Sequence, residues 1–263
     1  MDRVCAAGKR TTSATCLTKA QIQEIARVFG VRLEKKTKNA MWKELNARAK
    51  TNCTSDRCVV NRAGGLGSSS LRPVYPASWR ADPNTWLTNV DIDNVMRQYE
   101  RRYRSFAFVG VMPVDFSSYA EEGRCVVRQM CAFDALSLGK ARLGFVFNLD
   151  RHDQSGSHWV ALYVGLRKSD SNYGAYFFDS NGQPPPSSVA ELMRKIASQS
   201  GDDKFPVVVN RTRKQFENTE CGMFCVYFLV ECLKRRPFKD IVRSSMRDEE
   251  MTRLRKVHFE VAT

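Results

Sequence analysis

The spacing of apolar residues near the start of the chain predicts two amphipathic helices. In "TKAQIQEIARVFGV", apolar side chains recur three and four residues apart, which is the spacing of one helix face. Thr18 is suited to cap this helix and Gly30 to end it. A second helix is predicted in "TKNAMWKELNARA", with Thr37 as its cap. We therefore expect a small helical arm domain over residues 1–61, of a kind that either contacts DNA or only docks on a larger domain.

The next segment, 62–84, breaks this pattern. It is dominated by Gly, Ser and Pro, as in "RAGGLGSSSLRPVYPASWR". Such a composition is typical of a linker.

Beyond residue 85, helical and strand-like patterns alternate irregularly. Helices are predicted in "NVDIDNVMRQYERRY" and "SSVAELMRKIASQ", where a helical period recurs. Short apolar runs predict strands at 106–113, 143–149, 159–166, 174–180 and 205–210. From Cys221 onward, "CGMFCVYFLVECLKR" is apolar on nearly every face, which indicates a helix buried at the centre of a domain. We expect an α+β fold over residues 85–263, with a mixed sheet packed around this central helix.

Composition narrows the class of protein. The net charge of +14 favours an anionic partner, although no basic block of five residues or more appears. Non-specific nucleic-acid binding and plain solvated basic faces therefore both stay open. No apolar run is long enough for a membrane span and no secretory signal is evident, so we expect neither membrane attachment nor secretion.

The nine cysteines are predicted to be reduced thiols of a cytosolic protein. Four of them, Cys5, Cys16, Cys53 and Cys58, lie in the arm at an irregular spacing without a histidine. We therefore expect no structural zinc and no other metal or cofactor.

The switch from polar to apolar residues at Cys221-Gly222 indicates chemistry. A cysteine at the start of a helix lies at the positive end of the helix dipole, which favours the reactive thiolate. Gly222 leaves room for a substrate backbone. A buried thiol at a tight turn is the simpler alternative.

A base for this cysteine has three candidates. His258 lies in a charged tail, His152 in a polar loop, and His158 at the first position of an apolar strand. The next strand turns polar at Asp179, with Asn181 two residues on, and either side chain is placed to orient the imidazole. The same "DSNG" is also a turn signature.

In their joint order, "HWVALY", "YFFDSNG" and "QFENTECGMFC" resemble the ubiquitin-like-protein-specific and adenovirus-type cysteine proteases. The resemblance implies that His158 is the base, Asp179 or Asn181 its partner, Gln215 an oxyanion donor and Cys221 the nucleophile. It also implies that Trp86 and Trp159 form a narrow channel for a Gly-Gly backbone. The arm and "WLTNVDIDNVM" make the chain most similar to the polyprotein-processing proteases of large cytoplasmic DNA viruses, the African swine fever type.

The resemblance implies an endopeptidase that cleaves after Gly-Gly and matures a viral core or capsid polyprotein. We then expect it in the virion and the host cytoplasm. One alternative is a deconjugating protease that removes ubiquitin-like or SUMO tags, and another is a non-enzymatic DNA-binding virion protein. The sequence also leaves open whether the enzyme cuts itself between Gly65 and Leu66.

Overall fold

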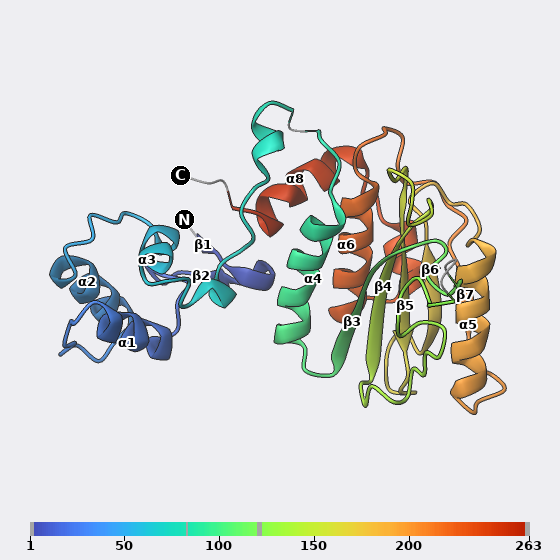
Figure 1. The fold of residues 1–263 in the computed structure, drawn as a ribbon, viewed down its shortest axis with the longest axis horizontal. Coiled ribbons are helices and arrows are strands. Elements are labelled where there is room, and N and C mark those ends of the chain that lie inside the picture. Colours follow the sequence, from blue (N-terminus) through green and yellow to red (C-terminus); the bar gives the residue numbers. More distant parts are fainter. Residues whose placement is uncertain (1–2, 83, 120–122, 261–263) are drawn as a thin grey trace. The chain divides into compact units, whose positions relative to one another are not determined.

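The computed structural model describes residues 3–82, 84–119 and 123–260, which form two compact units (Figure 1). The first unit comprises the chain up to Tyr75 and again from Lys256 onward, and the second runs from Pro76 to Arg255. The boundary after Tyr75 therefore lies inside the predicted linker. The C-terminal residues join the first unit, whereas the sequence analysis places them in the larger domain.

The core of the first unit is built by α1 (Lys19–Val28), α2 (Lys38–Arg48) and α3 (Asp56–Arg62). The predicted caps of the first two helices are confirmed, because the Thr18 and Thr37 hydroxyls each accept a bond from the backbone N–H three residues on. The helix α3 was not predicted, because it is too short to show a helical period. A hairpin of β1 (Arg3–Val4) and β2 (Arg10–Thr11), with the 3₁₀ turn η1 (Ala6–Gly8) between them, precedes these helices.

The glycine-rich stretch after α3 folds onto this helical core. The Gly65 N–H donates to the Val60 carbonyl at 2.8 Å. Gly67 has a left-handed φ of 88°, and a Cβ added there would lie 2.7 Å from Leu17. Leu66 packs against the same hydrophobic cluster, in which Leu71 is buried. The first part of the predicted linker, including η2 (Ser68–Ser70), is thus an ordered part of the first unit.

Three disulfides contradict the prediction that all cysteines are reduced. They join Cys5 to Cys16, Cys53 to Cys58, and Cys125 to Cys131. The paired Cα atoms lie 5.5, 5.4 and 6.1 Å apart, within the usual range for a disulfide. Each pair is close in the sequence, with separations of 11, 5 and 6 residues, and no pattern in the sequence distinguishes such pairs from free thiols. The four arm thiols considered for zinc are all in disulfides, and Cys221, Cys225 and Cys232 are free and buried.

A five-stranded sheet forms the centre of the second unit. Its order is β3 (Phe106–Pro113), β4 (Arg142–Asn148), β5 (Trp159–Gly165), β6 (Gly174–Phe178) and β7 (Val207–Val209). The outer pairs, β3 with β4 and β6 with β7, are parallel, and β5 is antiparallel to both of its neighbours. The prediction of an α+β fold with a mixed sheet is confirmed.

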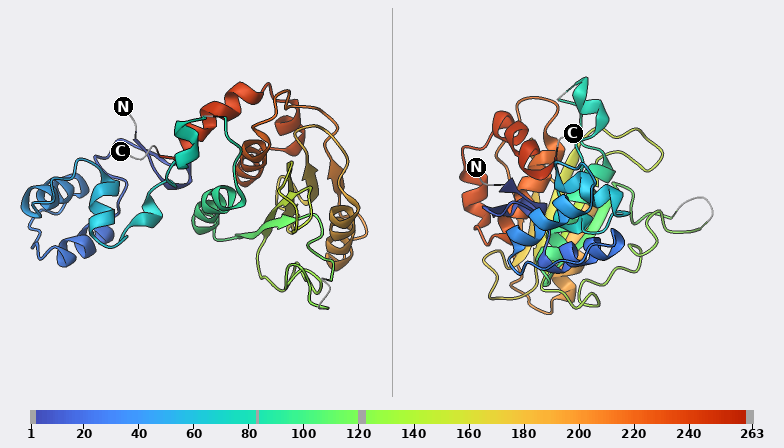
Figure 2. Two further views of the ribbon diagram at one scale, coloured as in Figure 1. Left: turned by 45° about the horizontal axis from the view of Figure 1, so that its top comes forward. Right: turned by 90° about the vertical axis from the view of Figure 1, so that its left-hand side faces the viewer.

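Helices cover both faces of this sheet (Figures 1 and 2). Alternate residues of the strands, such as Phe145 and Leu162, share one hydrophobic core with α5 (Ser187–Gln199). The other face packs on α6 (Cys221–Leu233), in which every residue except Glu231 is buried, and the Phe178 ring stacks on Phe228 with centroids 4.9 Å apart. On this face α4 (Asn89–Arg102) lies beside α6.

The remaining elements of the second unit were not predicted. They are η3 (Ala77–Arg80), α7 (Phe238–Arg243) and α8 (Asp248–His258), the last of which passes into the first unit at Lys256. None of the helices in the described ranges has both the length and the hydrophobicity that a membrane span requires.

Candidate active site

Cys221 is the first residue of α6, as the sequence predicts. Its side chain carries a free thiol and the residue is only 1% exposed. The carbonyl of the preceding residue, Glu220, accepts the first helical hydrogen bond, from the Phe224 N–H at 2.9 Å. The thiol therefore sits where unpaired backbone N–H groups of the first helical turn favour negative charge.

The ends of two strands bring His158 to Asp179. His158 immediately precedes β5 and Asp179 immediately follows β6. Because these strands are antiparallel neighbours, the start of β5 and the end of β6 lie at the same end of the sheet. The His158 Nε2 atom lies 2.6 Å from Asp179 Oδ1, and the two side chains are 14% and 2% exposed.

Asp179 is itself held in place by four hydrogen bonds to three further residues. Its carboxylate accepts hydrogen bonds from the backbone N–H groups of Asn181 and Gln183, at 2.9 and 3.0 Å. The Asn210 side chain brackets its backbone, with Oδ1 accepting from the Asp179 N–H and Nδ2 donating to the Asp179 carbonyl. The carboxylate is thus fixed before any substrate arrives.

These contacts determine the role of each ring nitrogen of His158. A carboxylate only accepts, so Nε2 donates to Asp179 and leaves Nδ1 for Cys221. Burial lowers the pKa of His158, but the hydrogen bonds to Asp179 and to the Cys221 side chain, with the charges of both, raise it to about 9. The imidazolium is therefore stabilised at neutral pH.

Asn181, the alternative partner, also lies close to the imidazole. Its Nδ2 is 3.4 Å from His158 Nε2, against 2.6 Å for the Asp179 oxygen. Since Nε2 already donates its proton to Asp179, it cannot accept from an amide N–H. The geometry favours Asp179 as the group that orients His158.

Gln215 lies at the same site, with its side-chain amide held at both ends. Ser180 Oγ donates to Oε1 at 2.7 Å, and Nε2 donates to the Glu217 carbonyl at 2.7 Å. An amide nitrogen has two N–H groups, so one remains to donate elsewhere. Gln215, His158, Asn181 and Trp86 line a common pocket of about 600 Å³.

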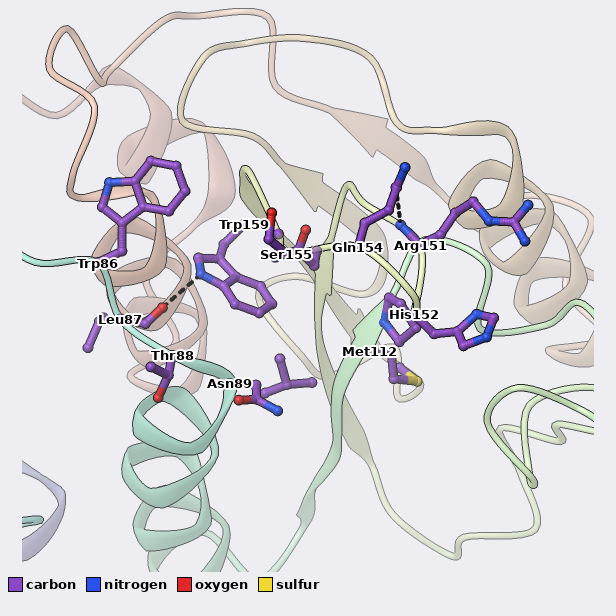
Figure 3. Close-up of a pocket in the computed structure, with 14 residues that line it drawn as sticks. Trp86, Leu87, Thr88, Asn89, Met112, Arg151, His152, Gln154, Ser155 and Trp159 are labelled. Carbon is purple, nitrogen blue, oxygen red and sulfur yellow. Dashed lines mark hydrogen bonds between the residues drawn. The ribbon is translucent and has the colours of Figure 1, made fainter. Parts of the chain in front are cut away.

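The two predicted channel residues lie at a second pocket, of about 470 Å³ (Figure 3). Trp159 is buried and its indole Nε1 donates to the Leu87 carbonyl at 3.0 Å, whereas Trp86 is 39% exposed. Met112 and the loop 151–156 line the pocket away from the Trp86 side (Figure 3). Trp86 lines both this second pocket and the pocket of His158 and Gln215, so its side chain lies where the two pockets meet.

The structure shows a different reason from the predicted one for a glycine at position 222. A Cβ atom added to Gly222 would lie 2.9 Å from the Leu87 Cβ and 3.4 Å from Ile92 Cδ1. The missing side chain therefore admits Leu87 and Ile92, and not a substrate backbone. Gly222 allows the segment that follows Trp86 to pack directly on α6.

A second histidine–carboxylate pair was missed by the sequence analysis. His152, in the loop that lines the second pocket, donates its backbone N–H to Asp115 Oδ1 at 3.0 Å and places Nδ1 2.7 Å from Oδ2. Although burial raises the pKa of Asp115, the hydrogen bonds from His152 lower it below its usual value. The pair fixes the loop beside β3. No spacing in the sequence connects these residues, which are 37 positions apart.

Among residues 3–82, 84–119 and 123–260, no three His, Cys, Asp or Glu side chains are grouped so as to bind a metal ion. The arrangement instead combines a thiol, an imidazole, a carboxylate and an amide donor. Such a set is suited to nucleophilic acyl transfer.

Comparison with known proteins agrees with this chemistry. Residues 145–260 match the Ulp1 protease family, C-terminal catalytic domain. A protein of Acanthamoeba polyphaga mimivirus that is named as a thiol protease is 28% identical over 86% of this chain and 76% of its own length. A protein of African swine fever virus named SUMO-1 cysteine protease is 24% identical over 88% of this chain and 91% of its own length.

The fold is also similar to that of a solved structure. A crystal structure of the African swine fever virus protease superimposes with a TM-score of 0.66 at 22% identity, covering 98% of this chain and 96% of that chain. The shared architecture therefore extends over nearly the whole of both chains.

Proposed function

Since residues 145–260 belong to the Ulp1 protease family, we propose that this cysteine protease is an endopeptidase that cleaves the peptide bond after a Gly-Gly sequence. The observation that carries the proposal is the position of His158, which hydrogen-bonds to Asp179 at 2.6 Å and whose pKa is raised by Asp179 and the Cys221 side chain. That arrangement prepares a thiolate–imidazolium pair.

The geometry supports a two-step reaction. The Cys221 thiolate attacks the carbonyl carbon that precedes the scissile bond, and the resulting oxyanion accepts bonds from Gln215 Nε2 and the Cys221 backbone N–H. His158 then gives its proton to the departing amine, and a thioester remains on Cys221. Water, deprotonated by His158, hydrolyses the thioester and restores the thiolate.

The preference for Gly-Gly is supported by the two tryptophans. Trp159 is fixed by its bond to Leu87, and Trp86 stands between the two pockets. A peptide that runs from the second pocket to Cys221 passes these two tryptophans. Side chains on the two residues before the scissile bond would collide with a ring there, and glycine has none.

For the natural substrate we propose a viral core or capsid polyprotein with Gly-Gly sites, cut during virion assembly. The viral origin of the relatives, one from mimivirus and one from African swine fever virus, supports this choice. The virion and the host cytoplasm follow as the proposed location.

A second candidate is removal of a SUMO-like tag. It is favoured by the Ulp1 family match and by the printed name of the African swine fever virus relative. The same residues would perform it, because the difference lies in the protein attached to the Gly-Gly sequence.

The test compares cleavage of two substrates by three forms of the protein. A recombinant polyprotein with Gly-Gly sites and a SUMO-conjugated protein are each incubated with wild type, Cys221→Ala and Cys225→Ala. Cys225 is a matched control, because it is a free thiol one helical turn further along and is fully buried. We expect Cys225→Ala to cleave and Cys221→Ala not to cleave. Cleavage by Cys221→Ala within tenfold of wild type contradicts the proposal, and the preferred substrate decides between the two candidates.

A further inference from the structure

One face of α8 contacts the loop between Gln215 and Cys221. Asp248 Oδ2 accepts from the Phe216 N–H at 2.8 Å, and the Thr252 hydroxyl donates to Glu220 Oε1 at 3.1 Å. The Arg255 Nε lies 3.0 Å from the Glu220 carboxylate. Residues 248, 252 and 255 are four and three positions apart, so they lie on one side of the helix. Glu220 directly precedes Cys221, and this face therefore contacts the loop at the residue next to the thiol.

Arg255 also contacts the segment that carries Trp86. Its Nη1 donates to the Thr85 carbonyl at 2.7 Å, and its guanidinium lies 4.3 Å from the centre of the Trp79 ring. Thr85 directly precedes Trp86, and the next residue, Leu87, accepts the indole N–H of Trp159. A single side chain thus bonds next to Trp86 and next to Cys221.

This side chain is also costly to place. Arg255 is 1% exposed and Glu220 is fully buried. Burial raises the pKa of Glu220, against the opposing effect of Arg255 and Thr252. A buried ion pair is weak as a source of stability, because an apolar pair of similar volume often stabilises a fold as well or better. What the Arg255–Glu220 pair adds is orientation, because a planar guanidinium fixes the positions of several acceptors at once.

We propose that Arg255 is a positioning residue that fixes the distance between the Trp86–Leu87 segment and Cys221. It acts through Thr85 and Glu220 and touches no substrate. This inference rests on the proposed function, because it assumes that the peptide passes Trp86 to reach the thiol. Arg255→Lys keeps a charge beside Glu220, but a lysine has no fork with which to bond Thr85 as well. The channel then shifts relative to the thiol, and a misplacement of about 1 Å can cost about 10²-fold in rate.

Two thiol reagents distinguish this positioning role from a purely structural role of Arg255. Iodoacetamide is small and reaches Cys221 without a peptide in the channel, whereas a Gly-Gly chloromethyl ketone must enter past Trp86. For Arg255→Lys we expect the rate of alkylation by the peptide reagent, relative to iodoacetamide, to fall about 10- to 100-fold. The kcat for a Gly-Gly peptide should fall by a similar factor, with little change in KM. Arg253→Lys is the matched control, because Arg253 is 66% exposed on the same helix and pairs only with Glu249 and Glu250 among the described residues.

Each outcome decides a different statement. If wild type reacts no faster with the peptide reagent than with iodoacetamide, the proposed channel fails and the role of Arg255 fails with it. If wild type discriminates and Arg255→Lys discriminates equally, only the positioning role is overturned. A thermal melt identifies a variant that does not fold. In that case Glu220→Gln, which keeps the shape and the acceptor oxygen but loses the charge, should show a smaller fall in the same ratio, and an unchanged ratio overturns the proposal.

Discussion

The pKa of His158 predicts how the rate of cleavage depends on pH. This pKa is raised to about 9 from 6.5, with burial acting downward and the bonds to Asp179 and Cys221 acting upward. In the proposed mechanism the departing amine takes its proton from the imidazolium, so kcat/KM should hold at neutral pH and fall as the pH passes about 9. Asp179→Ala removes one of the groups that raise this pKa, and the falling limb should move to lower pH. Rates measured from pH 6 to about 10 test both statements.

The control for this pH profile is folding. A group whose pKa is raised in the folded state adds stability below its unfolded pKa, here about 6.5, and this contribution is lost as the pH rises to about 9. Melting temperatures at each pH separate loss of activity from unfolding. An alkaline limb that stays in place in Asp179→Ala contradicts the role of the carboxylate. An equal movement of the limb in Asn181→Ala assigns part of that role to Asn181.

Gln215 makes a separate prediction about the transition state. Its amide is already oriented by Ser180 and by the Glu217 carbonyl, so its remaining N–H is available without reorganisation. Gln215→Ala should reduce kcat by about 10²–10³ with little change in KM, because the oxyanion exists only as the bond is attacked. Gln215→Glu keeps the shape but replaces the donor with an acceptor, and it should lose at least as much. A change confined to KM would make Gln215 a binding residue.

The sequence was sufficient for residues at the ends of recognisable elements. His158, Asp179 and Cys221 each stand where an apolar run begins or ends, so their approach follows from strand pairing and from the helix start. The contacts of Arg255 with Glu220 and of His152 with Asp115 were not predictable in this way. They join segments 35 and 37 residues apart and depend on packing, which no local pattern encodes.

Among the elements, prediction followed the strength of the apolar period. The strand β3 has the predicted limits, and α4 and α6 begin and end close to the predicted ones. In contrast, α7 has only six residues and α8 is rich in charge, so neither shows a clear apolar period. The helix α8, which was not predicted, is the one whose buried face contacts the loop between Gln215 and Cys221.

The start of α6 makes a prediction about packing. Gly222→Ala improves helix propensity by about 1 kcal/mol, but the new Cβ would lie 2.9 Å from the Leu87 Cβ. Overpacking of this kind costs about 1–3 kcal/mol, so the steric term should win and the melting temperature should fall. Displacement of Leu87 also disturbs the acceptor of Trp159, and cleavage of a Gly-Gly peptide should slow.

Gly201→Ala is the comparison for this substitution. Nothing lies within 4 Å of a Cβ there, and the cost comes only from the left-handed φ of 65°. It should leave peptide cleavage unchanged even if stability falls. Wild-type stability and activity in Gly222→Ala would show that Leu87 moves aside freely.

At the scale of the whole molecule, the cysteine prediction was wrong. The cysteines were predicted to be reduced, yet three disulfides close short loops in both units. The net charge of +14 still predicts non-specific attraction to nucleic acid, which a gel shift across a salt series would test. Charge and cysteine number are sums over the chain, and they carry no information on which residues meet.

The division into units also bears on self-cleavage. If the protease cleaves after Gly-Gly as proposed, "AGGLG" in its own chain offers a cut between Gly65 and Leu66. In the folded protein this stretch is a hydrogen-bonded turn, with Gly65 bonded to Val60 and Leu66 packed on the helical cluster. In the proposed channel a peptide passes Trp86 and Trp159 in an extended form, so the turn would first have to unfold. We therefore expect the native chain to stay intact.

Intact mass after incubation at high concentration tests this expectation. Wild type and Cys221→Ala should both keep their full mass while wild type cleaves an added Gly-Gly peptide. Leu71→Asp places a charge at a position that is 3% exposed in the same cluster, and it should loosen the turn. We expect this variant to release a fragment that ends at Gly65, and the double variant with Cys221→Ala to release none. A fragment ending at Gly65 from unmodified wild type would contradict the protection of this site by folding, because the proposed channel admits only an extended segment.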